Sequence, residues 1–100
     1  MSIRHVVSWK LSATDPATRA DDAAGIASRL EALVGVVAEI RSLRVGADVL
    51  GGDNWDVVLI ADFDDLAAVA RYQAHPAHQA AGAFIRSVVS AKMAVDFLVP

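Results

Sequence analysis

Hydrophobic residues follow a strand-like pattern along four segments of the chain. The first, 3–11, alternates with a period of two, although imperfectly. Its predicted inward face carries Ile3, His5, Val7, Trp9 and Leu11. Segment 55–63 is the strongest strand, because Val57 to Ala61 is apolar on both faces. Segments 40–45 and 92–99 are the other two predicted strands.

Between these strands, apolar residues recur at three- and four-residue spacing, which predicts amphipathic helices. The first helix starts at Pro16 behind Asp15 as capping acceptor, and Gly35 is its predicted end. Its inward stripe consists of Ala23, Ile26, Ala27, Leu30, Leu33 and Val34. A second helix, 66–74, follows a capping Asp64-Asp65 pair, and Pro76 interrupts it. Helix then resumes over 77–90, with an inward face of Phe84, Ile85, Val88 and Val89.

The elements follow the order β-α-β-β-α-β, which is typical of the ferredoxin-like α+β fold. Right-handed crossovers place the helices on one face of a four-stranded antiparallel sheet. If Val57, Leu59, Asp96 and Leu98 face the helices, the other face is apolar and has no cover inside the chain. That open face would carry Val58, Ile60, Met93, Val95, Phe97 and Val99. An apolar sheet face of this size predicts an interface, so we expect a homodimer formed by sheet-on-sheet packing.

Composition supports the same interpretation. One hundred residues fit a single domain, 1–100, and 55% of them are hydrophobic, above the ~45–50% typical of soluble domains. A second subunit is the simplest place for that excess. The net charge of −3, with no basic tract, argues against nucleic acid as a partner.

The chain contains no cysteine, which excludes disulfides and thiolate metal sites and is compatible with a reducing cytosol. Its first residues lack the apolar core of a signal peptide. No apolar run reaches the ~18 residues of a membrane span. We therefore expect a cytoplasmic protein with no membrane partner.

The candidate chemistry is concentrated in Tyr72-Gln73-Ala74-His75-Pro76-Ala77-His78, which holds two of the three histidines and the only tyrosine. An imidazole at His78 could remove a proton alpha to a carbonyl while the Tyr72 phenol stabilises the enolate. The alternative is that His78 is a packing residue whose hydrogen bond fixes the start of the helix. His75, before Pro76, is expected to serve the turn as a cap-like acceptor.

The first and last strands are neighbours in this topology, so His5 and Asp96 can pair on the helix side of the sheet. Such a pair would fix the tautomer of the imidazole. The alternative is a structural pair that orders the centre of the sheet. Trp9 and Trp55 could line a pocket or simply fill core volume.

A metal site has less support in the sequence. His75 and His78 have His-x-x-His spacing but no evident third ligand, and a catalytic zinc needs three. Carboxylates of the loop 46–56 remain an open alternative for magnesium or calcium. The same loop lacks a phosphate-binding lysine, so it does not indicate a nucleotide site. We expect neither a metal nor another cofactor.

Three stretches of the chain resemble the stress-responsive dimeric α+β barrel (Dabb) family. They are Ile3-Arg4-His5-Val6-Val7, the 72–78 segment with its His-Pro-x-His element, and Ala94-Val95-Asp96-Phe97. The resemblance spans essentially the whole chain and implies a homodimer with a barrel-like core and a pocket between sheet and helices. Among characterised members, the chain is most similar to the olivetolic acid cyclase type, which closes linear poly-ketones by aldol condensation without a cofactor.

This resemblance implies Tyr72 and His78 as the catalytic pair and His5 and Asp96 as further pocket residues. Val57 stands where those cyclases have a pocket histidine. The other predicted walls are apolar and include no strong cation: Trp9, Val57, Leu59 and Phe84, together with Ile26, Leu30 and Val88.

The predicted function is binding of a small apolar carbonyl compound, with polyketide-cyclase-like aldol cyclisation as the reaction. The alternative is a non-catalytic stress-response protein in which the same residues are structural.

Overall fold

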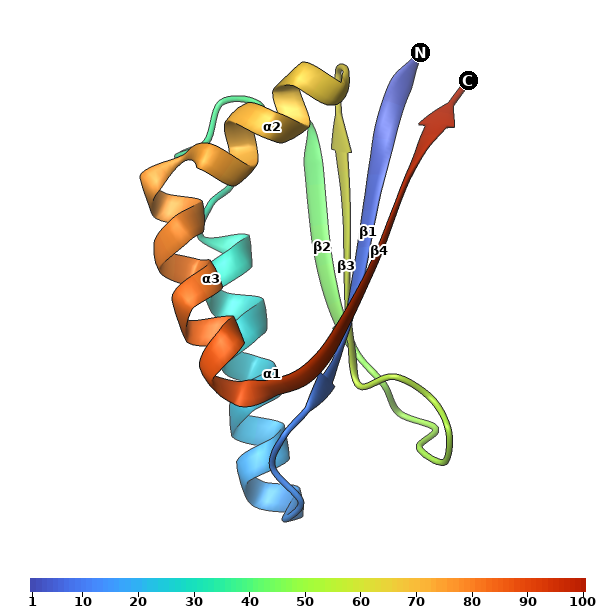
Figure 1. Ribbon diagram of the computed structural model, residues 1–100, viewed down its shortest axis with the longest axis vertical. Helices are drawn as coiled ribbons and strands as arrows, with labels where there is room; N and C mark the ends of the chain where they lie inside the picture. Colours follow the sequence, from blue (N-terminus) through green and yellow to red (C-terminus); the bar gives the residue numbers. More distant parts are fainter.

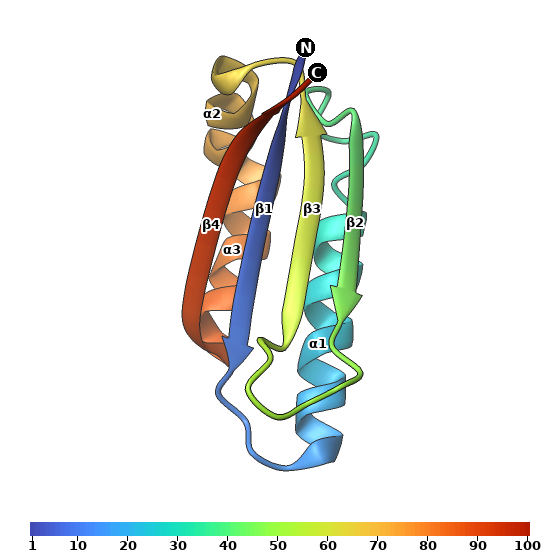
Figure 2. The same cartoon turned by 90° about the vertical axis from the view of Figure 1, so that its right-hand side faces the viewer.

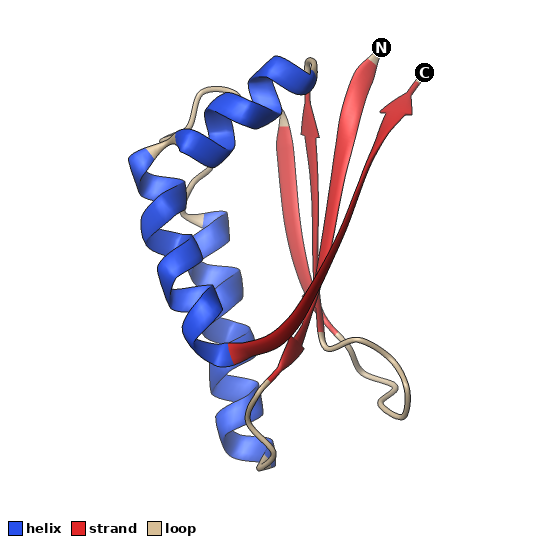
Figure 3. Cartoon of the chain, viewed as in Figure 1, coloured by secondary structure: helices blue, strands red, loops and turns tan.

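The computed structural model describes residues 1–100 as a layer of helices packed on one face of a sheet (Figures 1 and 3). The sheet is antiparallel, with strand order β2-β3-β1-β4. Its strands are β1 (Ser2–Leu11), β2 (Ser42–Ala47), β3 (Val57–Phe63) and β4 (Val89–Val99). The helices are α1 (Pro16–Glu31), α2 (Leu66–Ala74) and α3 (Pro76–Val88). The predicted ferredoxin-like arrangement is confirmed, and none of the helices is long and apolar enough to cross a membrane.

The first two helices begin at aspartates that cap them. Asp15 Oδ2 accepts a hydrogen bond from the Thr18 N–H at 2.9 Å, and Pro16 fills the first helical position. Asp65 Oδ1 accepts from the Ala68 N–H at 2.8 Å at the start of α2. Both caps satisfy amides that the helix itself leaves unpaired, which explains why the helices start where the sequence predicted.

A proline turn separates α2 from α3. His75 has an extended backbone (φ −63°, ψ 135°), as expected for a residue before proline. Its Nδ1 accepts a hydrogen bond from the Ala77 N–H at 3.0 Å, so His75 caps α3 through its imidazole. The predicted role of His75 in the turn is therefore what the structure shows.

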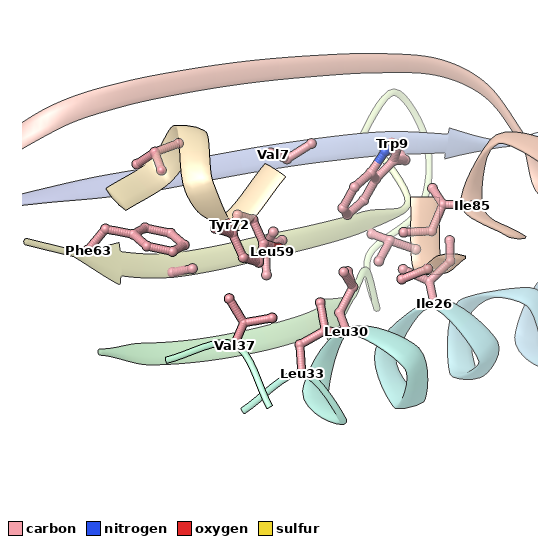
Figure 4. Close-up of a cluster of buried hydrophobic side chains, with 14 of the residues drawn as sticks. Val7, Trp9, Ile26, Leu30, Leu33, Val37, Leu59, Phe63, Tyr72 and Ile85 are labelled. Carbon is pink, nitrogen blue, oxygen red and sulfur yellow. The ribbon is translucent and has the colours of Figure 1, made fainter. Parts of the chain in front are cut away.

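The core lies between the sheet and the helices (Figure 4). In the register of β1 and β3, His5 lies opposite Ala61 and Val7 opposite Leu59. Alternate residues of both strands therefore form one continuous buried face. The predicted inward face of β1 is buried at every position: Ile3, His5, Val7, Trp9 and Leu11. His5 is the one polar residue among the buried side chains. A buried histidine inside an apolar layer therefore indicates a candidate functional site around His5.

The opposite face of the sheet has no cover within the chain (Figure 2). On it Ile60 is 42% exposed, Val95 51% and Phe97 44%. Arg4 crosses this face to Asp62 with two hydrogen bonds of 2.8 and 3.0 Å. The predicted open apolar face is thus present, and one ion pair lies on it.

Some details of the chain differ from expectation. Helix α1 ends at Glu31, before Gly35, whose φ of +84° belongs to the following turn. Val34 lies in that turn and is 53% exposed, so its placement in the inward stripe was wrong. Leu98 is paired with Ile3 on the helix side, yet it is 63% exposed because it sits near the end of an edge strand. The last strand begins at Val89, directly after α3.

Candidate functional site

A cavity of about 200 Å³ lies between the sheet and the helices α2 and α3. Strands β1 and β3 provide one wall through residues such as Val7 and Leu59, and α1 contributes Leu30. The lining residues that can take part in chemistry are His5, Trp9, Tyr72, His78, Arg86 and Lys92. The fold therefore gathers His5, Tyr72 and His78, which are distant in sequence, around one space.

Tyr72 and His78 lie against each other across the break between α2 and α3. Their ring centroids are 4.4 Å apart, with planes inclined at 61°. Tyr72 lies on the last turns of α2 and His78 in the first turn of α3. The proline turn between the helices is what brings the two rings together.

Two polar atoms of this pair have no partner in the protein. The Tyr72 hydroxyl and His78 Nδ1 are both buried, and neither makes a hydrogen bond. Buried polar atoms are usually paired, and leaving one unpaired costs about 1–3 kcal/mol. Two such atoms beside one cavity indicate a site where a ligand or water supplies the missing hydrogen bonds.

Burial also sets the protonation state of each group. It raises the pKa of the Tyr72 phenol to about 12, so the phenol keeps its proton at neutral pH. Burial lowers the pKa of His78 below its ordinary 6.5; the nearby Gln73 backbone opposes this shift, and the nearby charges of Lys92 and Arg86 add to it. The pair therefore presents a neutral imidazole and a protonated phenol, which are a base and a hydrogen-bond donor.

His5 is held in place from the neighbouring strand. It lies directly opposite Asp96 in the β1–β4 register, and its Nδ1 is 2.5 Å from Asp96 Oδ1. The side chain of His5 is 5% exposed and that of Asp96 33%. An N–H at Nδ1 donating to the carboxylate leaves Nε2, which has no hydrogen bond to the protein, as the acceptor nitrogen. The His5 and Tyr72 rings have centroids 6.2 Å apart.

Not all of the predicted walls line this cavity. Trp9, Leu59 and Leu30 do, whereas Val57, Phe84, Ile26 and Val88 do not, and Asp96, predicted as a pocket residue, is also absent from the lining. Val57 pairs with Trp9 in the sheet, is buried, and lines a separate pocket of about 190 Å³. Phe84 instead faces α1, where the Arg29 guanidinium lies 3.5 Å from its ring centroid. The amphipathic stripe of α3 is wide, and Phe84 belongs to the side that packs against another helix.

Two cations in the lining were not anticipated. Arg86 and Lys92 both line the cavity, which corrects the prediction that it has no strong cation. The sequence does contain the signal for each. His78, Gly82 and Arg86 are spaced by four along α3 and so share one face of the helix. Lys92 lies opposite Trp9 in the β1–β4 register, so it points to the same side of the sheet.

No group of three or more histidine, aspartate or glutamate side chains is arranged to hold a metal ion. In the loop between β2 and β3, the Asp48 carboxylate accepts hydrogen bonds from the Gly51 N–H at 2.6 Å and from Asn54 Nδ2 at 2.8 Å. The Asp48 carboxylate is thus engaged in folding the loop. His75 is likewise engaged, as the cap of α3.

A larger groove of about 580 Å³ lies between α1, the end of β2 and the loop that follows it. Its charged groups include Arg19 and Asp56, which are paired with each other at 2.6 Å. It contains no histidine or tyrosine. The groove is larger than the cavity beside Tyr72 and His78, but only that cavity is lined by residues with unpaired buried polar atoms. We therefore take the smaller cavity as the candidate site.

Comparison with known families agrees with the fold. Residues 3–99 match the model of the family described as Stress responsive A/B Barrel Domain, or Dabb. The chain belongs to the Dabb family. A search of curated proteins finds no match to this Dabb chain.

Solved structures share the fold of this Dabb protein over nearly its whole length. A dimeric protein of unknown function with a ferredoxin-like fold from Bacteroides fragilis is 28% identical, with a TM-score of 0.89 over 96% of this chain and 94% of that one. A dimeric ferredoxin-like protein of unknown function from Thermobifida fusca is 30% identical, with a TM-score of 0.84 over 99% and 92%. A hydroxynitrile lyase from Passiflora edulis is 14% identical over 99% and 94%, with a TM-score of 0.79, and shows likeness of fold alone.

Proposed function

We propose that this Dabb protein is an acid–base enzyme that removes a proton next to a carbonyl group and closes a carbon–carbon bond without a cofactor. The observation that carries the proposal is the pair of buried, unpaired atoms, the Tyr72 hydroxyl and His78 Nδ1, at one cavity. A neutral base and a protonated donor are what enolate chemistry requires at neutral pH.

The proposed reaction balances within one substrate molecule. His78 takes a proton from the carbon next to a carbonyl, and the electron pair of the broken C–H bond moves onto the carbonyl oxygen. The Tyr72 O–H donates a hydrogen bond to that oxygen as negative charge develops on it. The enolate carbon then bonds to a second carbonyl carbon, and the alkoxide formed there takes the proton held by His78. No oxidant, reductant or leaving group is involved in this ring closure.

In this proposal His5 and Asp96 position the site. Asp96 fixes the orientation and tautomer of His5, whose free Nε2 then faces the substrate as an acceptor. The cavity of about 200 Å³ is smaller than the ~300–1,000 Å³ typical of sites for drug-sized ligands. The substrate is therefore a short poly-ketone, not a long polyketide.

We also propose that the protein is a homodimer joined through the open sheet face. The exposed apolar residues of that face support this, as do the two relatives described as dimeric. The accessible surface supports it further. The isolated chain exposes 5857 Å², whereas a monomer of its mass is expected to expose roughly 5,400 Å².

Hydrogen exchange tests the first step without requiring the natural substrate. The protein is incubated with acetophenone in heavy water, and NMR follows deuterium entry into the methyl group next to the ketone. We expect His78→Gln to slow this exchange by ~10²–10⁴-fold. A linear triketone tests ring closure in parallel, by detection of the cyclic β-hydroxy ketone.

Stability measurements separate a catalytic role from a structural one. Removing an unpaired buried hydroxyl leaves no donor or acceptor without a partner, so Tyr72→Phe should unfold at the wild-type temperature or slightly above it while exchange slows. His75→Asn is the matched control, because it removes a histidine outside the cavity and keeps a capping side chain. Its exchange rate should equal that of the wild type. Wild-type exchange no faster than buffer, with Tyr72→Phe clearly destabilised, would leave the non-catalytic function standing.

A further inference from the structure

Two cations face the candidate site without a partner. Arg4, Arg19, Arg41 and Arg71 each pair with a carboxylate, whereas Lys10 and Arg29 lie over aromatic rings and Arg44 lies outside the cavity without an ion pair. Arg86 and Lys92 make no ion pair and no hydrogen bond, although both line the cavity. A pair of free positive charges at one small cavity is not explained by folding, because neither charge holds anything in place.

No carboxylate in the lining balances these charges. Asp96 is near the site, but its Oδ1 is engaged by His5 at 2.5 Å. The chain as a whole carries a net charge of −3, so a positive cavity is a local feature and not a consequence of composition.

The backbone gives Arg86 its position. A Cβ atom on Gly82 would lie 3.1 Å from Arg86 Nη1, so the guanidinium occupies the space that a side chain at residue 82 would fill. His78, Gly82 and Arg86 follow one another along α3 at intervals of one turn, and Lys92 approaches from β4. The positive end and the acid–base end of the cavity are therefore built on the same helix face.

We propose that Arg86 and Lys92 bind the carboxylate of the substrate, so that the natural ligand is a small oxo acid with two ketone groups and not a neutral ketone. This inference names the substrate class of the proposed reaction and rests on that function. The guanidinium and ammonium groups hold the carboxylate, and the ketone lies deeper, beside the contacting rings of Tyr72 and His78. The carbon between ketone and carboxylate then faces the His78 base, and the cations stabilise the developing negative charge.

A carboxylate fits this site better than a phosphate. The cavity is small, and much of its remaining lining is apolar, including Val7, Leu30, Leu59 and Ile85. A flat monoanion attached to carbon can bury its apolar part against these residues while its charge stays at the cations. An inorganic phosphate has no apolar part to bury.

Binding of benzoate and benzamide tests the inference without turnover. The two probes have nearly the same shape, and only benzoate is charged. NMR titration of the wild-type protein at low salt should give a Kd for benzoate at least ~10-fold below that for benzamide. Arg86→Gln and Lys92→Gln should each raise the Kd for benzoate ~3–10-fold and leave that for benzamide unchanged. Arg71→Gln, which removes a charge outside the cavity, is the matched control and should change neither.

The possible results separate this inference from the proposed function. Equal affinity for benzoate and benzamide, or loss of benzoate binding in Arg71→Gln as large as in Arg86→Gln, overturns the anion site. Displacement of benzoate by an equal concentration of inorganic phosphate also overturns the choice of a carboxylate. Failure of the proposed chemistry would appear elsewhere, as the absence of deuterium exchange in a protein that still selects benzoate.

Discussion

The hydrogen bond between His5 and Asp96 allows a quantitative prediction, because its two side chains differ in burial. The His5 side chain is 5% exposed, and its only hydrogen bond in the protein is to Asp96. The Asp96 side chain is 33% exposed, so water can solvate its carboxylate when the histidine is absent. Losing Asp96 therefore leaves a buried N–H unpaired, whereas losing His5 leaves a carboxylate that is largely rehydrated.

From this asymmetry we expect Asp96→Ala to lower the free energy of unfolding by about 1–3 kcal/mol. His5→Phe keeps most of the ring volume and removes the group that needs a partner, so it should cost less. In the double variant the Asp96→Ala cost should largely disappear. The coupling free energy of the double-mutant cycle should be about 1–2 kcal/mol. This is less than a fully buried charged hydrogen bond contributes, because the Asp96 carboxylate is partly exposed to water.

Urea denaturation followed by tryptophan fluorescence measures all four free energies, provided that protein concentration is held constant. Asp96→Asn adds a control, since its amide oxygen can still accept from His5 Nδ1 and should recover part of the loss. A coupling free energy within ~0.3 kcal/mol of zero would refute the argument, because it would mean that the two side chains do not depend on each other.

Three other predictions concern the interface, the pH dependence and the helix caps. Val95→Asp places a charge on the open sheet face, so it should prevent dimer formation and cause unfolding or aggregation, and a soluble, folded wild-type monomer in light scattering would contradict the proposed dimer. Because burial lowers the pKa of His78 in the folded state, acid favours the unfolded chain, so stability should fall as pH drops below about 6.5, and less steeply in His78→Gln. Thermal melts across this range would check it. Asp65→Ala removes the bond to the Ala68 N–H and should cost about 1 kcal/mol, whereas Asp65→Asn should retain most of it in the same urea assay.

Most of the fold could be predicted from the sequence because its signals are local. Alternation in 3–11 sets the buried face of β1, and a capping aspartate begins each of the first two helices. Strand order followed from connection rules, which also made β1 and β4 neighbours. The sequence-based predictions were wrong where no local pattern indicates the end of an element. Val34 fits the three- and four-residue spacing of the helical stripe, but α1 ends at Glu31. No pattern in the sequence predicts that the helix ends there.

The candidate site was only partly predictable. The pairing of His5 with Asp96 follows from strand order and register alone, and the structure brings the two together. The contact between Tyr72 and His78 depends on the angle at which α3 leaves the His75–Pro76 turn, which spacing cannot give. Phe84 was misplaced for a related reason. A residue known to face inward can still face either the sheet or another helix.

The missed cations have a more general cause. Charged residues are normally assigned to solvent, since burying a charge is costly, and Arg86 and Lys92 are indeed exposed. A long side chain can nevertheless line a cavity with its stem and hold its charge at the mouth. Their positions were available from the sequence, because Arg86 shares a helix face with His78 and Lys92 lies opposite Trp9. The positions of cations at the mouth of an apolar pocket therefore follow from helix face and strand register. Composition and hydrophobic pattern do not indicate them.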